Sequence, residues 1–270
     1  MIRPAFLVLA CAAMSGCGGG GEASFGFSGT NLNGASYSGR GVTAKNSNLT
    51  TAVTTEATDA QFTFAPSSDG GSGANAYTSV TLDLGGARQV YFSDTGNVAT
   101  SFAGDDSVIF STGLKDGPAT QNTLFVTAIS TSGLFAEDVG FYVLGNQTPA
   151  VDLPSVAASY SGRAVIMDGS NPLDISGGTF NALVNFAGTP ALSSGSIVAD
   201  TGTLAGTQLN LTPAALAGAS FETTLTSADV TLNSSYIEGR FFGPTGSELA
   251  GTTHFTTPSD TYVGMYGAMN

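Results

Sequence analysis

The sequence predicts an all-β protein in which a small β-rich N-terminal domain precedes a C-terminal antiparallel, water-soluble β-barrel of about eight strands. Short runs rich in Val, Ile, Thr, Phe and Tyr alternate with clusters of Gly, Asn, Asp, Ser and Pro along most of the chain. No long window shows helical periodicity. The second half is a long series of short predicted strands, and open edges in such a sheet would invite aggregation unless the sheet closes on itself.

The expected strands of the first half follow its apolar, β-branched and aromatic runs. They are Gln61–Ala65, Ser79–Leu84, Gln89–Ser93, Ser107–Ser111, Thr123–Ile129 and Val139–Leu144. Turn-forming residues separate these runs, so each run is expected to reverse direction at its end.

The second half gives a longer series of expected strands, some with the partial alternation of apolar and polar residues that suits half-buried strands. They are Tyr160–Met167, Thr179–Phe186, Gly195–Asp200, Thr207–Leu211, Ser220–Thr226, Ala228–Asn233, Tyr236–Phe242, Gly251–Thr256 and Thr261–Tyr266. The best helix candidate is Pro213–Ala217, with Pro213 at a first helical position and Gly218 at the stop. These segments are too short and too polar on both faces for a membrane barrel.

Two prolines mark a boundary between the halves, because Pro fits poorly inside a sheet. With Pro149 and Pro154 as punctuation, the expected domains are residues 37–150 and residues 155–270. The hexapeptide Ala-Ser-Tyr-Ser-Gly-Arg occurs at residues 35–40 and again at residues 158–163. Its place at the start of both halves favours a duplicated entry strand, and chance repetition in a chain of low complexity is the alternative.

The N-terminus has the layout of a secretory signal. Arg3 precedes an apolar stretch from Ala5 to Ala13, and small residues precede Cys17. With cysteine first after the cut, residues 1–16 resemble a bacterial lipoprotein signal, which implies lipid on Cys17 and a membrane as partner. Residues 17–36 are rich in Gly, Ser and Asn and are expected to form a flexible tether. A cleaved signal without lipid is the alternative.

Composition limits the partners that the chain can bind. The chain has 270 residues, Lys+Arg 7 and Asp+Glu 20, and a net charge of −13. Its negative charge disfavours nucleic acid and leaves no polybasic patch for anionic lipid. The negative charge has two interpretations: it maintains solubility, or it attracts a basic partner. Cys11 lies in the signal and Cys17 carries the lipid, so the mature fold is expected to lack a disulfide and a cysteine-based metal site.

The stretch from Tyr236 to Gly251 is the most specific piece of the sequence. Gly239 and Gly243 bracket the pair Phe241 and Phe242, whose rings must point to opposite faces of a strand. Pro244 ends that strand because it brings no donor to the ladder, and a turn is expected before Gly251. The last strand ends in Gly264-Met265-Tyr266-Gly267.

This pattern resembles the closing hairpin of the β-barrel lobes of transferrin-binding protein B and related surface lipoproteins. The resemblance covers residues 140–270 and implies that the N-terminal half is a smaller handle-like domain. The residues that carry it, all expected to be structural, are Gly239, Phe241, Phe242, Gly243, Pro244, Glu248, Gly251, Gly264 and Gly267. It also implies capture of an iron-carrying protein, haem or another solute at the outer membrane, with delivery to a transporter. The cell surface is the expected location, and the periplasmic face is the alternative.

Catalytic and metal-binding patterns are scarce in the sequence. His254 is the only histidine, and a strand His on a polar face is most often solvated; haem ligation is its alternative role. Ser68–Gly73 and Asp105-Asp106 suggest calcium turns, but neither has EF-loop spacing, and Asp and Gly form turns for local reasons. The sequence therefore predicts no catalytic residue, no cofactor and no metal.

The leading hypothesis is a lipid-anchored surface binding protein without catalysis. The alternative is a structural or adhesive surface lipoprotein that captures no solute, and a carbohydrate-active enzyme is a third hypothesis because distant acidic pairs leave no sequence signature. The interior of the second domain shows whether a ligand can bind inside the barrel, since a filled core has no room for one.

Overall fold

The structure of the protein is a computed structural model. It describes residues 36–46, 54–66, 77–84, 87–95, 98–100, 106–111, 114, 116–117, 120–130, 137–169 and 174–270. The predicted signal, Cys17, the predicted tether up to residue 35, Ser68–Gly73 and Asp105 lie outside the described residues.

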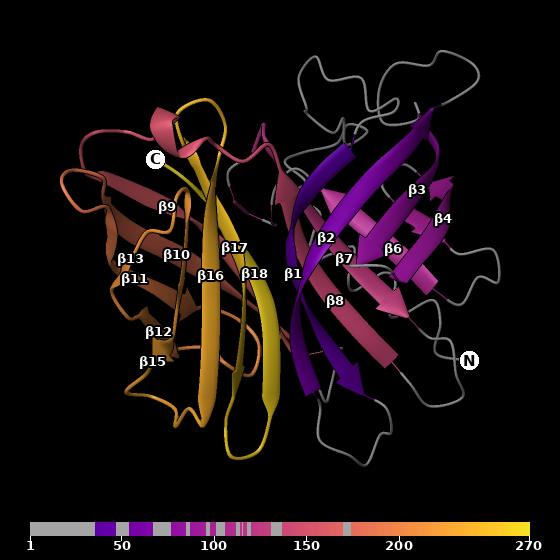
Figure 1. Ribbon diagram of the computed structural model, residues 1–270. Helices are drawn as coiled ribbons and strands as arrows, with labels where there is room; N and C mark the ends of the chain where they lie inside the picture. Colours follow the sequence, from indigo (N-terminus) through magenta and orange to yellow (C-terminus); the bar gives the residue numbers. More distant parts are fainter. Residues whose placement is uncertain are drawn as a thin grey trace.

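The predicted all-β fold class is confirmed, and the strands form two barrels that lie side by side (Figure 1). The N-terminal sheet is a closed antiparallel barrel in which the first strand also pairs with the last. Its strands are β1 Ser36–Asn46, β2 Thr54–Pro66, β3 Tyr77–Leu84, β4 Ala87–Thr95, β5 Val98–Thr100, β6 Asp106–Ser111, β7 Thr123–Ser130 and β8 Glu137–Gly145.

The β-rich handle-like domain expected at the N-terminus is therefore itself a barrel. Closure depends on β1, which begins in the repeated hexapeptide that favoured an entry strand, although its glycines interrupt any apolar run. A Cβ atom added to Gly39 would lie 2.0 Å from the carbonyl oxygen of Val143, so glycine lets β1 approach β8 closely enough to complete the ladder.

A short linker with the 3-10 helix η1 Ala150–Asp152 leads to the second sheet. The strands of this sheet are β9 Ala158–Asp168, β10 Ile175–Asn185, β11 Ala191–Ala199, β12 Gln208–Leu211, β13 Ala214–Ala215, β14 Ser220–Thr223, β15 Leu225–Thr226, β16 Ser234–Phe242, β17 Glu248–Thr256 and β18 Thr261–Met269. Residues 36–40 of the first copy of the repeated hexapeptide begin β1, and the second copy begins β9. Each of these strands pairs with the last strand of its own sheet.

The second sheet curls into a barrel through one bent segment. β14 pairs with β16, whereas β15, one residue further along, pairs with β12 on the other side. The hydroxyl of Ser235 accepts a hydrogen bond from the Leu225 amide at 2.9 Å and donates one to the Leu225 carbonyl at 3.0 Å, which bridges β15 and β16. With β14 and β15 as one bent strand and β13 off the path, the strand number agrees with the prediction.

Two local predictions were wrong. Ala228–Asn233 is a loop, in which the Asp229 carboxylate accepts a hydrogen bond from the Gln208 amide at 2.8 Å. Pro213–Ala217 contains β13 in place of a helix, because the backbone amide of Leu216 bonds to the carbonyl of Pro190 at 2.9 Å. Partners on neighbouring strands satisfy these backbone groups, and local sequence does not reveal such partners.

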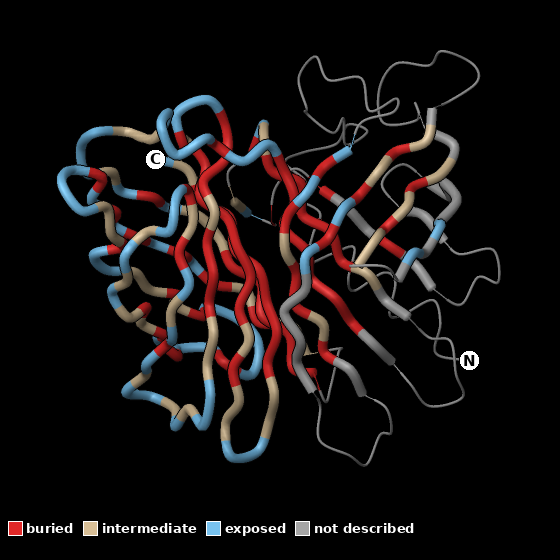
Figure 2. Tube along the Cα trace, viewed as in Figure 1, coloured by how far each residue is buried: buried red, intermediate tan, exposed pale blue. Residues whose placement is uncertain are grey.

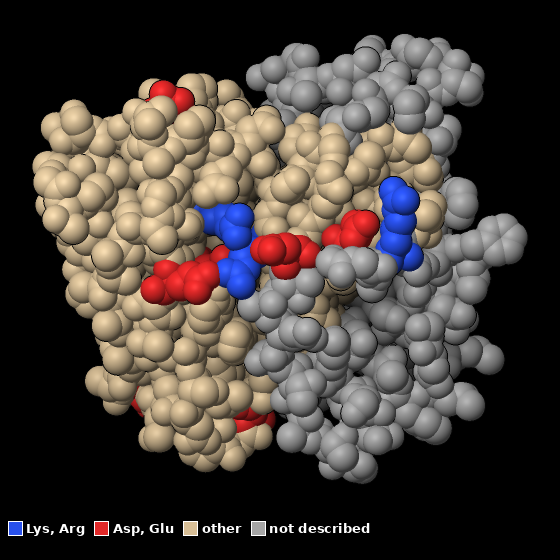
Figure 3. Space-filling view, in the orientation of Figure 1, with Lys and Arg blue, Asp and Glu red and all other residues tan. Residues whose placement is uncertain are grey.

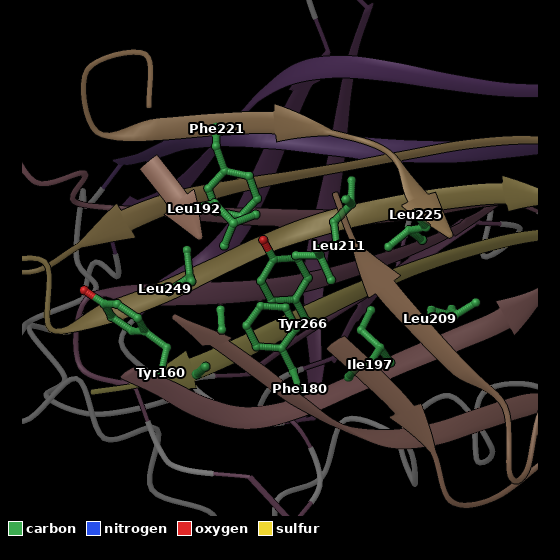
Figure 4. Packing of buried hydrophobic residues seen from close by; sticks show 14 of the residues in the cluster. Tyr160, Phe180, Leu192, Ile197, Leu209, Leu211, Phe221, Leu225, Leu249 and Tyr266 are labelled. Carbon is green, nitrogen blue, oxygen red and sulfur yellow. The ribbon is translucent and has the colours of Figure 1, made fainter. Parts of the chain in front are cut away.

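Aromatic side chains fill the interior of the C-terminal barrel (Figure 4). The rings of Phe180 and Tyr266 stack with centroids 4.0 Å apart, and the Tyr266 hydroxyl donates a hydrogen bond of 2.7 Å to the Glu238 carbonyl. Burial raises the pKa of Tyr266 well above its ordinary value, so this hydroxyl remains a donor. The N-terminal barrel has a similar filled interior around Phe62, Phe64 and Tyr142.

A third apolar cluster lies between the barrels and joins them. It combines outward-facing residues of both sheets, and in Figure 2 the buried segments continue from one barrel into the other. Phe125, Phe141 and Val143 contribute from the N-terminal barrel, and Met265 and Phe242 from the C-terminal barrel. The faces of β8 and β18 are therefore buried on both sides, which explains their near-continuous apolar sequences.

We expect Phe180→Ala to lower the free energy of unfolding by about 3–5 kcal/mol, because it leaves a cavity against Tyr266 in the filled interior. Leu183→Ala, on the same strand but 42% exposed, is the matched control and should cost less than about 1 kcal/mol. Urea unfolding measures both values. Equal losses in the two variants would contradict the assignment of Phe180 to a tightly packed core.

Candidate functional site

Among the described residues, the interior of the C-terminal barrel is filled and open hollows lie on the outer surface. The C-terminal interior is occupied by residues such as Phe221, Leu249 and Phe255, each at most 1% exposed. Two open hollows lie on the outside. One, of about 430 Å³, follows the loop from Leu225 to Leu232, and the other, of about 560 Å³, lies between Asp59 and Asp83 of the N-terminal barrel and Arg240 of the C-terminal barrel.

The aromatic pair of the sequence motif lies at the junction of the barrels, with its rings on opposite faces of β16. Phe241 points into the C-terminal barrel, with its ring centroid 5.6 Å from that of Tyr160 and 5.2 Å from that of Phe186. Phe242 belongs to the cluster between the barrels. One strand thus anchors both hydrophobic cores.

The linker attaches to the same motif through backbone hydrogen bonds. The amide of Thr148 bonds to the Phe241 carbonyl at 2.8 Å, and its hydroxyl donates to the Gly243 carbonyl at 2.6 Å. Gly243 has φ +86, a left-handed conformation that favours glycine, and it is followed by Pro244 in an exposed turn. The motif therefore fixes the path of the chain between the barrels.

Glu248 joins the barrels through a buried carboxylate that is 1% exposed. Its Oε1 accepts hydrogen bonds from the amides of Gln121 at 2.7 Å and Asn122 at 3.0 Å, and its Oε2 accepts one from the Thr123 hydroxyl at 2.7 Å. The Asn122 side-chain amide adds another at 3.0 Å. Backbone amides that converge in this way form an anion-binding nest.

The remaining motif glycines mark close approaches between backbones or rings. An added Cβ would lie 1.9 Å from the Glu238 carbonyl oxygen at Gly251, and 2.4 Å from the Tyr266 hydroxyl at Gly239. At Gly264 it would lie 2.6 Å from the Val165 carbonyl oxygen, and at Gly267 it would lie 2.3 Å from the ring of Phe125 in the other barrel. No larger side chain fits at these positions without movement of the backbone or the rings.

Charged side chains gather where the two barrels meet (Figure 3). Arg40 of β1 crosses to the C-terminal barrel, where its guanidinium bonds to Glu222 and lies 3.7 Å from Glu238. It also lies 3.4 Å from Asp59, which lies 3.9 Å from Arg240. We call these residues, Arg40, Asp59, Glu222, Glu238 and Arg240, the seam cluster.

The seam cluster presents Asp59 and Glu222 outward and keeps Glu238 and the two guanidinium groups recessed. The side chains of Asp59 and Glu222 are 85% and 55% exposed, whereas those of Arg40 and Arg240 are about one quarter exposed. Glu238 is 3% exposed and faces Glu222 directly across β14 and β16. Burial raises the pKa of Glu238, while Arg240 and Arg40 oppose that rise.

Sequence reasoning did not find the seam cluster, because its members come from four strands of two domains. The one available signal was Arg40 as the last residue of the repeated hexapeptide. Its counterpart Arg163 pairs with Asp200 at 2.8 Å, also on an outer face.

His254 lies half-buried on β17, with its ring stacked on Tyr236 at a centroid distance of 5.2 Å. Its Nδ1 is buried and has no hydrogen-bond partner. Burial lowers the pKa of His254, so the ring is neutral near pH 7.

The described residues contain neither a cluster of metal-ligating side chains nor a membrane-spanning helix. In that part of the chain, no three side chains of the His, Cys, Asp and Glu types come together as a metal site. The same residues hold no helix with the length and apolar character to cross a bilayer.

One family of known proteins matches the C-terminal barrel. Residues 153–270 match the family described as C-lobe and N-lobe beta barrels of Tf-binding protein B. The resemblance inferred from the closing motif is therefore confirmed for this domain. A search of curated proteins gave no match.

Several solved structures are similar to the chain. A mutant of transferrin-binding protein B from Haemophilus parasuis Hp5 shares 12% identity, with a TM-score of 0.39, over 87% of this chain and 76% of that one. The N-lobe domain of lactoferrin-binding protein B from Moraxella bovis shares 12% identity, with a TM-score of 0.36, over 86% of this chain and 98% of that one. A putative outer membrane protein from Bacteroides fragilis NCTC 9343 shares 13% identity, with a TM-score of 0.29, over 89% of this chain and 100% of that one.

We expect Glu248→Gln to lower the free energy of unfolding by about 1.5–3 kcal/mol, because an amide cannot accept all the hydrogen bonds that the carboxylate accepts from the N-terminal barrel. Glu222→Gln, on the exposed side of the junction, is the control and should cost about 0–1 kcal/mol. Hydrogen exchange of the Gln121 and Asn122 amides should accelerate only in Glu248→Gln. Unchanged protection of these amides would contradict the proposed attachment.

The pH dependence of stability should carry a signature of His254. Since burial lowers the folded-state pKa below the unfolded value of about 6.5, the folded state binds fewer protons than the unfolded state in that window. The contribution of the neutral ring is complete above the unfolded pKa and is lost as pH falls from about 6.5 through the folded pKa. NMR titration of this single histidine should give a midpoint below that of the urea-unfolded chain.

The variant His254→Gln isolates the contribution of His254 to the pH dependence of stability. The buried Glu238 titrates with the opposite sign, because its raised pKa favours the protonated folded state as pH falls. Glu238 is present in both proteins, so the difference between their stability curves reports His254. A difference that does not change between pH 7 and pH 5 would refute the assignment.

Proposed function

We propose that this chain, whose C-terminal barrel is a lobe of the Tf-binding protein B type, is a lipid-anchored surface protein that binds an iron-carrying protein on the outside of its barrels without catalysis. The observation that carries the proposal is the family match over residues 153–270. The names of the similar proteins associate their barrels with transferrin and lactoferrin. The outer membrane of a Gram-negative cell is the proposed location, with lipid on Cys17 as the anchor.

The filled interiors favour a macromolecular ligand over a solute held inside a barrel. Phe180, Tyr266 and Phe221 occupy the space that a lipocalin-like ligand would need. The hollows are on the surface, where they suit contact with another protein better than enclosure of a small molecule. Loops on rigid scaffolds commonly carry recognition, and the two barrels packed through a shared core supply such a scaffold.

A non-catalytic role is supported by the surroundings of the titratable residues in the described parts of the chain. His254, the one histidine, stacks on Tyr236, and the acidic residues of the seam cluster are paired with Arg40 and Arg240. These pairings account for the perturbed groups by burial and neighbouring charge, without a nucleophile and base in contact. Delivery of the captured iron source to an outer-membrane transporter is the proposed next step.

We expect the immobilised protein to retain an iron-carrying protein of the transferrin or lactoferrin class. We expect it to leave the Soret band of free haem unchanged, because the described residues fill the interior of the C-terminal barrel. Surface plasmon resonance and absorbance titration measure the two results. A Soret shift on titration would instead favour haem as the captured solute. If neither class of ligand binds and cells that display the protein aggregate, the structural or adhesive alternative replaces capture.

Anchoring depends on a single thiol in this proposal. Cys17→Ser should move the protein from the membrane fraction to the soluble fraction of cells, because two or more acyl chains give stable anchoring and their attachment requires this cysteine. Mass spectrometry of the wild-type N-terminal peptide should show the added acyl mass. A wild-type protein that is soluble after signal cleavage would contradict the lipid anchor and leave the binding proposal to be judged by the ligand assay.

A further inference from the structure

The linker between the barrels holds the two most exposed large hydrophobic side chains among the described residues. Val151 in η1 is 90% exposed and Val156 is 65% exposed. The turn η1 lies above the strand ends at one end of the C-terminal barrel in Figure 1, and Val156 follows η1 in the same linker, two residues before β9. Exposed apolar side chains on a short ordered segment are typical of a surface that contacts a partner or a membrane.

The valines cannot fold inward, because the residues around them are fixed. Thr148 is buried and bonded to Gly243, and Leu153 packs against the core of the C-terminal barrel. The Asp152 amide bonds to the Pro149 carbonyl at 2.9 Å, which closes the single turn of η1. The linker is thus attached on either side of Val151, and both valines stay on the outer surface.

The N-terminal segment joins the fold at this same end. Ser38 of β1 pairs with Gly145, the last residue of β8, and Gln147 forms a bridge with Phe242. The chain therefore enters β1 beside the start of the linker. Eighteen residues separate Cys17 from Ser36, and a coil of that length has an r.m.s. end-to-end distance of about 23 Å.

Charge differs between the two ends of the C-terminal barrel. At the linker end, the strand termini and loops contain two charged side chains, Asp152 and the buried Glu248 at the start of β17. At the opposite end, the strand termini and loops carry five aspartates and no Lys or Arg, namely Asp168, Asp174, Asp200, Asp229 and Asp260. An end with few charges loses little hydration free energy on approach to a lipid surface.

We propose that the linker end, with Val151 and Val156, rests on the surface of the lipid bilayer that holds the acylated Cys17, and that the aspartate-bearing end faces away from it. The proposal rests on the lipid anchor of the proposed function. The tether confines this end near the bilayer, and the two valines then enter the apolar side of the interface. A zwitterionic surface suits the contact, because Asp152 and the acidic chain are repelled by anionic headgroups.

The test uses the full lipidated chain with single labels. Once the signal is cleaved and Cys17 is acylated, no free thiol remains, so Val151→Cys and Val156→Cys each introduce one site for an environment-sensitive fluorophore. Ser259→Cys, exposed at the opposite end, is the matched control. The proteins are reconstituted into phosphatidylcholine vesicles with and without a nitroxide-labelled lipid, and flotation confirms anchoring.

The expected result is a blue shift and stronger nitroxide quenching at positions 151 and 156 than at position 259. Equal emission and quenching at all three positions on vesicles that carry the floated protein would overturn the proposal, and would leave a protein partner as the occupant of the valines. Failure to float contradicts the lipid anchor itself and so is distinguished from failure of the orientation. Val156→Asp should abolish the shift of a label at position 151 while flotation persists, which separates interfacial contact from mere tethering.

Discussion

The arrangement of the molecule depends on one buried contact, the carboxylate of Glu248 held by amides and a hydroxyl of the N-terminal barrel. Within the described residues, no Lys or Arg lies within ion-pair distance of this group. A buried charge is costly unless hydrogen bonds replace its hydration, so the segment from Gln121 to Thr123 must stay where Glu248 can reach it. Phe242 and Thr148 act at the same junction. Together these contacts set the relative position of the barrels more tightly than the linker alone could.

This constraint has a functional consequence. The described residues of the two barrels pack into filled interiors and a shared apolar interface, which together form a rigid support. In the proposed function, recognition therefore uses the outer surface, where the seam cluster and the strand ends differ in charge and polarity. In a chain of which only 10% is charged, the placement of each charged group matters. The recessed guanidinium groups of Arg40 and Arg240 offset acidic neighbours, while the remaining aspartates of the C-terminal barrel gather at one end.

Sequence reasoning worked where the signal is local. Period-2 and β-branched runs identified most strands of both sheets, and the motif from Gly239 to Gly251 led to the family whose model matches residues 153–270. It failed where backbone partners are distant. Only the repeated hexapeptide indicated β1, because its glycines interrupt the apolar pattern, and the rest of the strand was not predicted. Ala228–Asn233 has strand-like composition but folds as a loop, in which Asp229 accepts a hydrogen bond from Gln208. The seam cluster could not be predicted, because the sequence does not show which of its distant charged residues form ion pairs.

By itself, the sequence determined the all-β class, the division near Pro149 to Pro154 and the need for glycine at crowded crossings, because these follow from local propensity and side-chain size. Only the tertiary structure decided that the N-terminal domain closes as a barrel, that Phe241 and Phe242 serve two different cores, and that Glu248 crosses to the other domain. These outcomes depend on which backbone groups and surfaces meet although they are far apart in the sequence. The free energy of such contacts is shared among residues that no local sequence pattern connects.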